Sequence, residues 1–186
     1  MNFNKHSKLE GQHAFLGASK YHWINYDADK IVDSWKKYQA VKRGTELHEL
    51  AKDLIRLGIK LPRSKKTFNM YVNDAIGYKM TPEQVLYVSP VAFGTADSIC
   101  FRDGVLRIHD LKTGTIPASM HQLEIYAALF CLEYDYRPGE IQTELRIYQG
   151  NEILVGQPTA DEILPIMDKI ITFDKIITNL MENGDE

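Results

Sequence analysis

Two cysteines, Cys100 and Cys131, are all that the chain contains, and both lie within apolar runs. Isolated thiols of this kind are typical of small buried side chains in a reducing compartment, although a disulfide between them stays open. They also exclude an iron–sulfur cluster held by four cysteines of this chain. The sequence therefore leads us to expect no iron–sulfur cluster and a protein of the cytoplasm.

Long apolar runs are missing as well. No stretch approaches the roughly 18 apolar residues that indicate a membrane-spanning helix, so we expect no membrane partner. The first ten residues are polar and lack the apolar stretch of an export signal, which again favours the cytoplasm, or the bacterial host's cytoplasm if a phage encodes the protein. With 44% hydrophobic and 25% charged residues, the 186 residues suit one globular domain.

The chain also lacks an excess of basic residues, since its formal charge is -3. Net charge governs long-range attraction, whereas a binding face depends on where the charges lie. The basic residues are bunched into two groups, Lys36, Lys37, Lys42 and Arg43, then Lys60, Arg63, Lys65 and Lys66. Each group is most simply a solvated surface. Lys65 and Lys66 are nevertheless candidates for following a DNA backbone.

Hydrophobic periodicity predicts helices, then strands, then helices again. Helices are expected over residues 16–26, 29–39, 43–58, 68–76, 119–134 and 160–181. Strands are expected over residues 85–88, 92–101, 105–111, 141–148 and 153–155. Thr45 and Gly58 would cap the third helix at its two ends, and Arg102-Asp103-Gly104 would form a hairpin turn. This order suits an α/β sandwich with a mixed sheet.

The strongest chemical signal is the pair Asp97 and Asp110-Leu111-Lys112. A tight hairpin would bring both carboxylates to one end of the sheet. Strand alternation places Asp110 and Lys112 on one face and sends Leu111 into the core. Two carboxylates suit Mg²⁺ or Mn²⁺, and a lysine beside the cation can neutralise charge that develops on a phosphate. An isolated D-x-K tripeptide is most often a surface hairpin, so the neighbouring motifs decide its meaning.

Four motifs occur in order: Arg43-Gly-Thr-Glu-Leu-His48, Gly94-Thr-Ala-Asp97, His109-Asp-Leu-Lys-Thr-Gly114 and Gln122-Leu-Glu-Ile-Tyr126. Together they resemble the PD-(D/E)XK nuclease superfamily and its RecB-type exonuclease branch, in particular small phage-borne members. Residues 16–23 look like the opening helix of those members, so the resemblance covers most of residues 13–130. It implies a restriction-endonuclease-like αβββαβ core with extra N- and C-terminal helices. Ala96 stands where the superfamily has its eponymous proline.

The resemblance also implies roles for individual residues. His48, Asp97, Asp110 and the backbone carbonyl of Leu111 become ligands of Mg²⁺ or Mn²⁺, and Lys112 becomes the catalytic lysine. Gln122 and Tyr126 match the Q-x-x-x-Y motif beside the active site and would contact DNA; a spacing of four places them on one helix face. Glu46 and Glu49 both flank His48. We expect Glu49 to be the catalytic one, with solvent exposure as the alternative for both.

Other chemistry-bearing residues have simpler explanations. His109 should face away from Asp110 and pack in the core. His121 is expected to be an exposed helix residue, although it could touch a phosphate. Tyr21 and Trp23 could stack on an unpaired base, but core packing is the expectation for Trp23.

Taken together, the sequence predicts a Mg²⁺- or Mn²⁺-dependent deoxyribonuclease, an exonuclease acting at DNA ends in recombination, repair or replication. The alternatives are a catalytically inactive DNA-binding or protein-binding module on the same fold and a metal-dependent hydrolase of a small substrate. The choice between exonuclease and endonuclease, cleavage polarity, strand preference, a homo-oligomeric state and a recombination or annealing partner protein stay open. A single domain is expected, with a helical elaboration over 1–42, a catalytic core over 43–158 and a C-terminal helix over 159–186.

Overall fold

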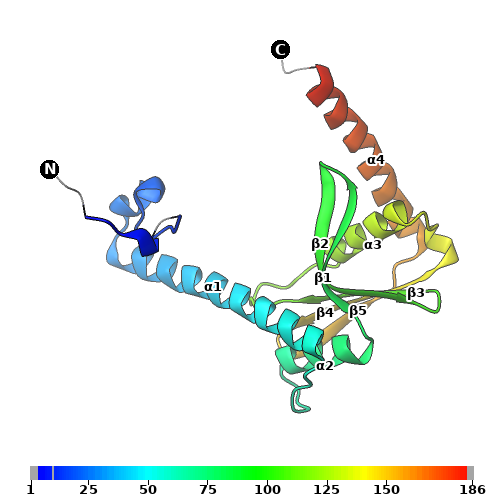
Figure 1. Cartoon of the computed structure of the whole chain (residues 1–186), viewed down its shortest axis with the longest axis horizontal. Helices are drawn as coiled ribbons and strands as arrows, with labels where there is room; N and C mark the ends of the chain where they lie inside the picture. Colours follow the sequence, from blue (N-terminus) through cyan, green and yellow to red (C-terminus); the bar gives the residue numbers. More distant parts are fainter. Residues whose placement is uncertain (1–3, 10, 184–186) are drawn as a thin grey trace. The chain divides into compact units, whose positions relative to one another are not determined.

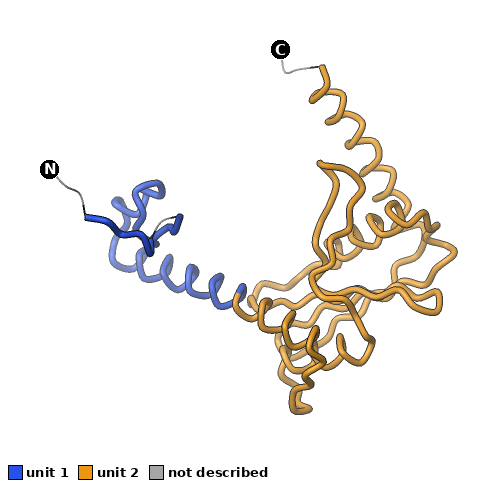
Figure 2. Tube along the Cα trace, in the orientation of Figure 1, with its two compact units in different colours: residues 1–45 blue, residues 46–186 orange. Residues whose placement is uncertain are grey.

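The computed structural model describes residues 4–9 and 11–183, so predictions on residues 1–3, 10 and 184–186 lie outside the described residues. The chain divides into two compact units, residues 1–45 and 46–186 (Figure 2). The single domain and its internal boundaries stay predictions. Within the described ranges, no helix combines the length and apolar character needed to cross a membrane.

Five strands form one mixed sheet in the larger unit (Figure 1). In sheet order they are β1 (Thr81–Ser89), β2 (Ala92–Arg102), β3 (Val105–Leu111), β4 (Gln142–Gln149) and β5 (Glu152–Gly156). The pair β3–β4 is parallel and the other three pairs are antiparallel. A parallel pair needs a crossover, which here contains helix α3 (His121–Glu133). The predicted α/β fold, with an αβββαβ core and extra terminal helices, is confirmed.

Helices cover both faces of the sheet, because strand alternation sends apolar side chains to each side. On one face, α3 and α4 (Ala160–Asn183) pack over a buried cluster that includes Leu106 and Ile108 of β3. On the other face, α2 (Thr67–Gly77) and the C-terminal part of α1 (Ala28–Leu57) pack over Leu111 and Tyr148. The end of β3 therefore lies between two cores.

Helix α1 differs from the prediction of two helices over residues 29–39 and 43–58, since the backbone is helical from Ala28 to Leu57. Thr45 does not cap a new helix; its hydroxyl donates to the Val41 carbonyl one turn earlier, at 3.3 Å. The predicted end is correct. Gly58 has a φ of +67°, and the amide of Ile59 donates to the Leu54 carbonyl, as in a Schellman motif.

The turn between β2 and β3 sets the register of the pair that carries both predicted carboxylates. Asp103 and Gly104 have φ values of +53° and +75°, which a two-residue type I′ hairpin requires. Arg102 pairs with Val105, and the regular register runs on to Ser98 opposite His109. The same register continued by one residue would bring Asp97 opposite Asp110, and the Leu111 amide donates to Oδ2 of Asp97 at 2.9 Å.

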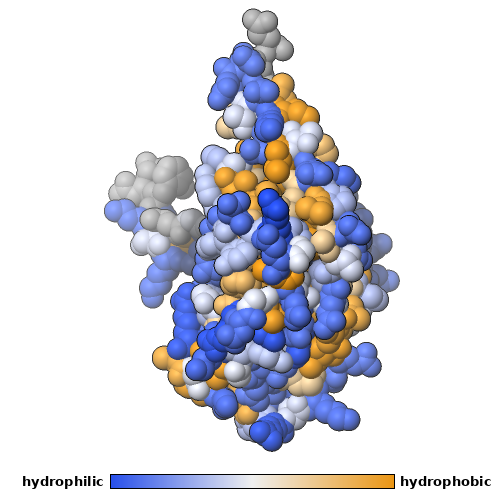
Figure 3. Space-filling model, turned by 90° about the vertical axis from the view of Figure 1, so that its right-hand side faces the viewer, coloured by the Kyte–Doolittle hydropathy of each residue, from blue (hydrophilic) through white to orange (hydrophobic). Residues whose placement is uncertain are grey.

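Helix α4 uses one side for the core and leaves other apolar side chains in solvent. Ile163 is buried, and Ile166, Met167 and Ile170 pack against the same cluster. Farther along, the exposed residues include Phe173, Ile176, Leu180 and Met181. Figure 3 shows hydrophobic side chains alternating with polar ones over this helix. The end of α4 therefore contributes little to the core.

Candidate metal centre

Three carboxylates from neighbouring strands form a row at one level of the sheet. The β1–β2 register pairs Pro82 with Ser98 and Gln84 with Ala96, so Glu83 faces Asp97 although the two are not themselves a ladder pair. The β2–β3 pairs end at Ser98 opposite His109, and the same register continued by one residue brings Asp110 level with Asp97. Opposed like charges destabilise a sheet unless something compensates them. The row therefore indicates a position where positive charge is bound.

His48 of α1 joins the row. Its Nδ1 atom lies 3.4 Å from Oδ2 of Asp97. Ligand atoms of His48, Glu83 and Asp97 all lie within 4.8 Å of one another, and all three residues are partly buried. Ala51 and Ile55, one and two turns farther along α1, are buried against the second core cluster and fix the helix face that presents His48. The three side chains can together hold a metal ion.

Glu83 occupies an unusual backbone conformation inside a strand, with a φ of +53°. Glutamate rarely adopts this left-handed region, and such strain typically costs about 1–3 kcal/mol and persists where the surroundings enforce it. Pro82 before it is buried, and Gln84 after it resumes the regular register. The distortion is therefore local to the residue that supplies a carboxylate to the cluster.

Asp110 anchors a chain of polar side chains that leads away from the row. Lys112 donates to Oδ1 of Asp110 at 3.1 Å and to the Gln122 side-chain carbonyl at 2.9 Å. The Gln122 amide in turn donates to the Tyr126 hydroxyl at 3.1 Å. The Oδ2 atom of Asp110 also lies 3.1 Å from the ammonium group, yet it is buried and accepts no hydrogen bond within the described structure. Asp110 is nevertheless not among the residues whose ligand atoms gather in the cluster of His48, Glu83 and Asp97.

The electrostatics of the row favour bound positive charge. The hydrogen bond with Asp97 raises the pKa of His48. Burial raises the pKa of Asp110, and the Asp97 charge adds to the shift. Burial and the Asp97 charge likewise raise the pKa of Glu83. A metal ion bound beside these carboxyl groups would oppose both shifts, because a nearby positive charge favours the ionised form.

No protein-family model, curated protein or solved structure matches this chain. The chain has a mixed α/β fold with a cluster of His48, Glu83 and Asp97 that can hold a metal ion.

The structure brings together most of the residues that the sequence singled out. His48 and Asp97 lie in the cluster, while Asp110, Lys112, Gln122 and Tyr126 form the adjoining polar chain. The backbone amide of Leu111 donates to Oδ2 of Asp97 at 2.9 Å, so Leu111 adjoins the site; the ligand role of its carbonyl stays a prediction.

Three predicted residues lie apart from the cluster. Glu49 is exposed and pairs with Lys52 at 3.2 Å, so it supplies no ligand atom to the cluster. Successive helix residues point about 100° apart, so Glu49 diverges from His48. Lys65 and Lys66 are exposed in the segment before α2 and belong to neither group.

The acidic residue that sequence reasoning missed is Glu83. Only the pairing of β1 with β2 brings Glu83 level with Asp97, so its place in the site follows from the register of that hairpin. His109 lies as expected on the opposite side of β3, buried against Tyr78 and Tyr148. Burial lowers its pKa to about 3, so it stays neutral.

Gly94 has a steric role next to the polar chain. A Cβ atom at this position would lie 2.8 Å from Cε1 of Tyr126. We therefore expect Gly94→Ala to displace the Tyr126 ring and, through it, Gln122. If the protein has the nuclease activity that the sequence predicts, the rate of DNA cleavage by this variant should fall by several-fold to about 100-fold, because misplacement by about 1 Å can cost roughly 100-fold in rate. Steady-state kinetics would measure the loss. Gly77→Ala, whose Cβ meets nothing within 4 Å, is the matched control; equal rates in both variants would contradict the role.

Proposed function

We propose that this protein is a Mg²⁺- or Mn²⁺-dependent DNA nuclease that hydrolyses phosphodiester bonds at DNA ends, in recombination, repair or replication. The observation that carries the proposal is one arrangement: a row of three carboxylates with a histidine, joined through Asp110 to Lys112. The four motifs that resemble the RecB-type branch of the PD-(D/E)XK superfamily supply most of these residues. Glu83 comes from outside those motifs.

The residues fit a hard divalent cation. His48, Glu83 and Asp97 would hold it, and the buried Oδ2 atom of Asp110, which accepts no hydrogen bond among the described residues, is a further candidate ligand. Carboxylate oxygens suit Mg²⁺ and Mn²⁺, and the imidazole, a softer donor, favours Mn²⁺ of the two. When bound, such a cation stabilises charge developing on phosphate oxygens and eases deprotonation of a water.

In the proposed reaction, Lys112 acts on the phosphate. Its ammonium group has three N–H donors, of which two are directed to Asp110 and Gln122. The third can donate to a phosphate oxygen or to the attacking water. Asp110 and Gln122 fix the position of the ammonium group, so little reorganisation is needed when negative charge develops.

The outer end of the polar chain suits a polymer. Gln122 is exposed and Tyr126 is half-buried, so a long substrate can reach both. A tyrosine hydroxyl of ordinary pKa is protonated at neutral pH, and burial raises the pKa of Tyr126 further. The Gln122 amide and the Tyr126 hydroxyl can then contact phosphate oxygens of DNA without adding charge.

The test is incubation of the purified protein with end-labelled linear DNA and with closed circular DNA, in Mn²⁺, in Mg²⁺ and in chelator. We expect loss of the linear DNA that depends on metal, with the circle intact. Cleavage of the circle would make the enzyme an endonuclease. No cleavage of either DNA by folded, metal-loaded protein would contradict the nuclease and favour an inactive DNA-binding module.

Lys65 and Lys66 provide a separate prediction about DNA binding. Both are exposed in the segment before α2. If they follow the DNA backbone, the Lys65→Glu/Lys66→Glu variant should bind DNA several-fold more weakly, with a shallower salt dependence. Fluorescence anisotropy in chelator measures this without cleavage, and calorimetric titration should give unchanged Mn²⁺ affinity. Unaltered DNA affinity would remove the two lysines from the binding face.

A further inference from the structure

The N-terminal unit differs in charge from the rest of the chain. Residues 1–45 hold eight lysine and arginine residues against four aspartate and glutamate residues, a formal charge of +4 in a chain whose total is -3. Both tryptophans of the sequence, Trp23 and Trp35, also belong to this unit. Basic residues interleaved with aromatic ones are typical of surfaces that bind single-stranded nucleic acid.

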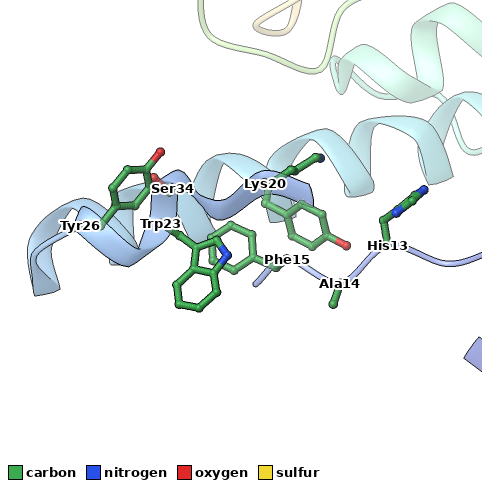
Figure 4. Close-up of a pocket in the computed structure, with 8 residues that line it drawn as sticks. His13, Ala14, Phe15, Lys20, Trp23, Tyr26 and Ser34 are labelled. Carbon is green, nitrogen blue, oxygen red and sulfur yellow. The ribbon is translucent and has the colours of Figure 1, made fainter. Parts of the chain in front are cut away.

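A cavity of about 170 Å³ lies within this unit (Figure 4). It is lined by the rings of Phe15, Trp23, Tyr26 and Tyr38, together with His13, Ala14, Lys20 and Ser34. Tyr26 and His13 lie toward opposite ends of the view, with Trp23 and Phe15 between them. A cavity of about 150 Å³ is known to accept a benzene ring, so this space suits one planar base.

A hydrogen bond and ring–ring contacts fix the aromatic side chains that line the cavity. The Trp23 indole N–H donates to the Gly17 carbonyl at 3.1 Å, which fixes the plane of the ring. Phe15 packs edge-on against Trp35, with ring centroids 5.0 Å apart, and against Tyr38 at 5.3 Å. Fixed rings lose little freedom when a ligand stacks on them.

Positive charge lies at the same place. Lys20 lines the cavity and is exposed. The Lys30 ammonium group lies 4.6 Å from the centre of the Tyr26 ring, which lines the cavity, although Lys30 is not itself a lining residue. Two cations beside a set of aromatic rings match a nucleotide, which presents a planar base next to a phosphate.

The rings do not form an enclosed core. Among the described residues of this unit, no aromatic side chain is buried, and Trp35 stays 45% exposed. Trp23 was expected to pack in a core, but it is half-buried and lines the cavity. The open side of the cavity is therefore accessible to a ligand.

We propose that this cavity binds an unpaired base of single-stranded DNA, with the base stacked against Trp23 and Phe15 and the flanking phosphates paired with Lys20 and Lys30. The choice of DNA rests on the proposed function. The cavity thereby assigns the N-terminal unit to the capture of a single-stranded segment or of a frayed duplex end.

Intrinsic fluorescence tests this directly, because both tryptophans lie in the unit. Wild-type protein is titrated with oligothymidylate in chelator, where no cleavage can occur, and with a relaxed, covalently closed circular duplex that has neither a free end nor an unpaired loop. We expect saturable quenching by the oligothymidylate and little change with the circular duplex. Thymidine monophosphate at the same concentration should quench far less, because it lacks the neighbouring phosphates. Equal quenching by the monophosphate would overturn strand binding in favour of a nucleotide site.

Matched variants locate the response. Trp35→Phe should keep the quenching, since Trp35 does not line the cavity, whereas Trp23→Phe should lose most of it. Trp23→Ala should weaken oligothymidylate binding by about tenfold or more. Lys20→Gln should make the negative slope of log affinity against log salt concentration shallower by about 0.7, the value for one lost phosphate contact. Lys37 is exposed and lies outside the cavity, so Lys37→Gln should leave the slope unchanged. Circular dichroism checks that each variant is folded.

Failure of this proposal is distinguishable from failure of the nuclease. Absent quenching together with metal-dependent cleavage would overturn the base-binding cavity and leave the nuclease standing. Quenching without cleavage in any metal would support the cavity and contradict the nuclease. Fluorescence that changes with protein concentration but not with oligothymidylate would assign the cavity to a second copy of the chain and overturn DNA binding.

Discussion

Replacing Lys112 with alanine is expected to lower the rate of DNA cleavage by about 10²–10³-fold, the cost typical of losing one preorganised donor to a charged transition state. The ammonium group is held by Asp110 and Gln122, which leaves one N–H for the phosphate or the water. Alanine removes that donor together with its charge. Single-turnover rates at saturating Mn²⁺ measure the effect on chemistry apart from binding.

The affinity of the Lys112→Ala variant for Mn²⁺ should equal or exceed that of the wild type, because the substitution removes a positive charge beside Asp110. Lys169→Ala, at an exposed position of α4, is the matched control and should cleave at the wild-type rate. A Lys112→Ala protein that cleaves as fast as the control would show that the lysine takes no part in the reaction.

Replacing Glu83 with glutamine is expected to weaken Mn²⁺ binding by about 100-fold or more, since loss of an outer-shell partner alone costs about 10–100-fold. Glutamine keeps the shape of the side chain and the strained backbone position but removes the ligand charge. Glu49→Gln should leave the affinity within about twofold of the wild type, because Glu49 is exposed and paired with Lys52. Isothermal titration in the absence of DNA measures both.

These two variants test the structure against the sequence-based prediction, because the structure places Glu83 in the cluster whereas the sequence predicted Glu49. Greater loss in Glu49→Gln than in Glu83→Gln would restore Glu49 to the site and contradict the cluster of His48, Glu83 and Asp97. Asp97→Asn serves as a positive control. Its amide oxygen can still accept the Leu111 N–H, so the fold is kept while the ligand charge is lost.

Local chemistry explains which parts of the site were predictable. The Asp103-Gly104 turn fixes a two-residue hairpin, and strand alternation then places Asp97 level with Asp110 and Lys112 beside Asp110. The spacing of four between Gln122 and Tyr126 brings their side chains into contact on α3. Turn geometry and helix spacing each involve only a few neighbouring residues, so both can be predicted from the sequence.

Glu83 could not be found in the same way. The register of β1 with β2 changes between Tyr87 and Ser89, so counting from the turn misaligns the strands by one residue. The positive φ of Glu83 has no signal in its residue type. The side-chain orientation of Glu49 could not be predicted either. The packing of Ala51 and Ile55 decides which face of α1 is turned toward the strands, and the residues beside His48 do not report it.

Anomalous scattering from Mn²⁺-soaked crystals tests most directly whether α1 and strands β1, β2 and β3 build a divalent metal centre. We expect one strong peak bound by His48, Glu83 and Asp97, at the roughly 2.0–2.2 Å typical of small divalent cations. The same peak should be absent from crystals of Asp97→Asn. A saturated Mn²⁺ peak elsewhere, or none at this cluster, would contradict the metal centre and the nuclease built on it.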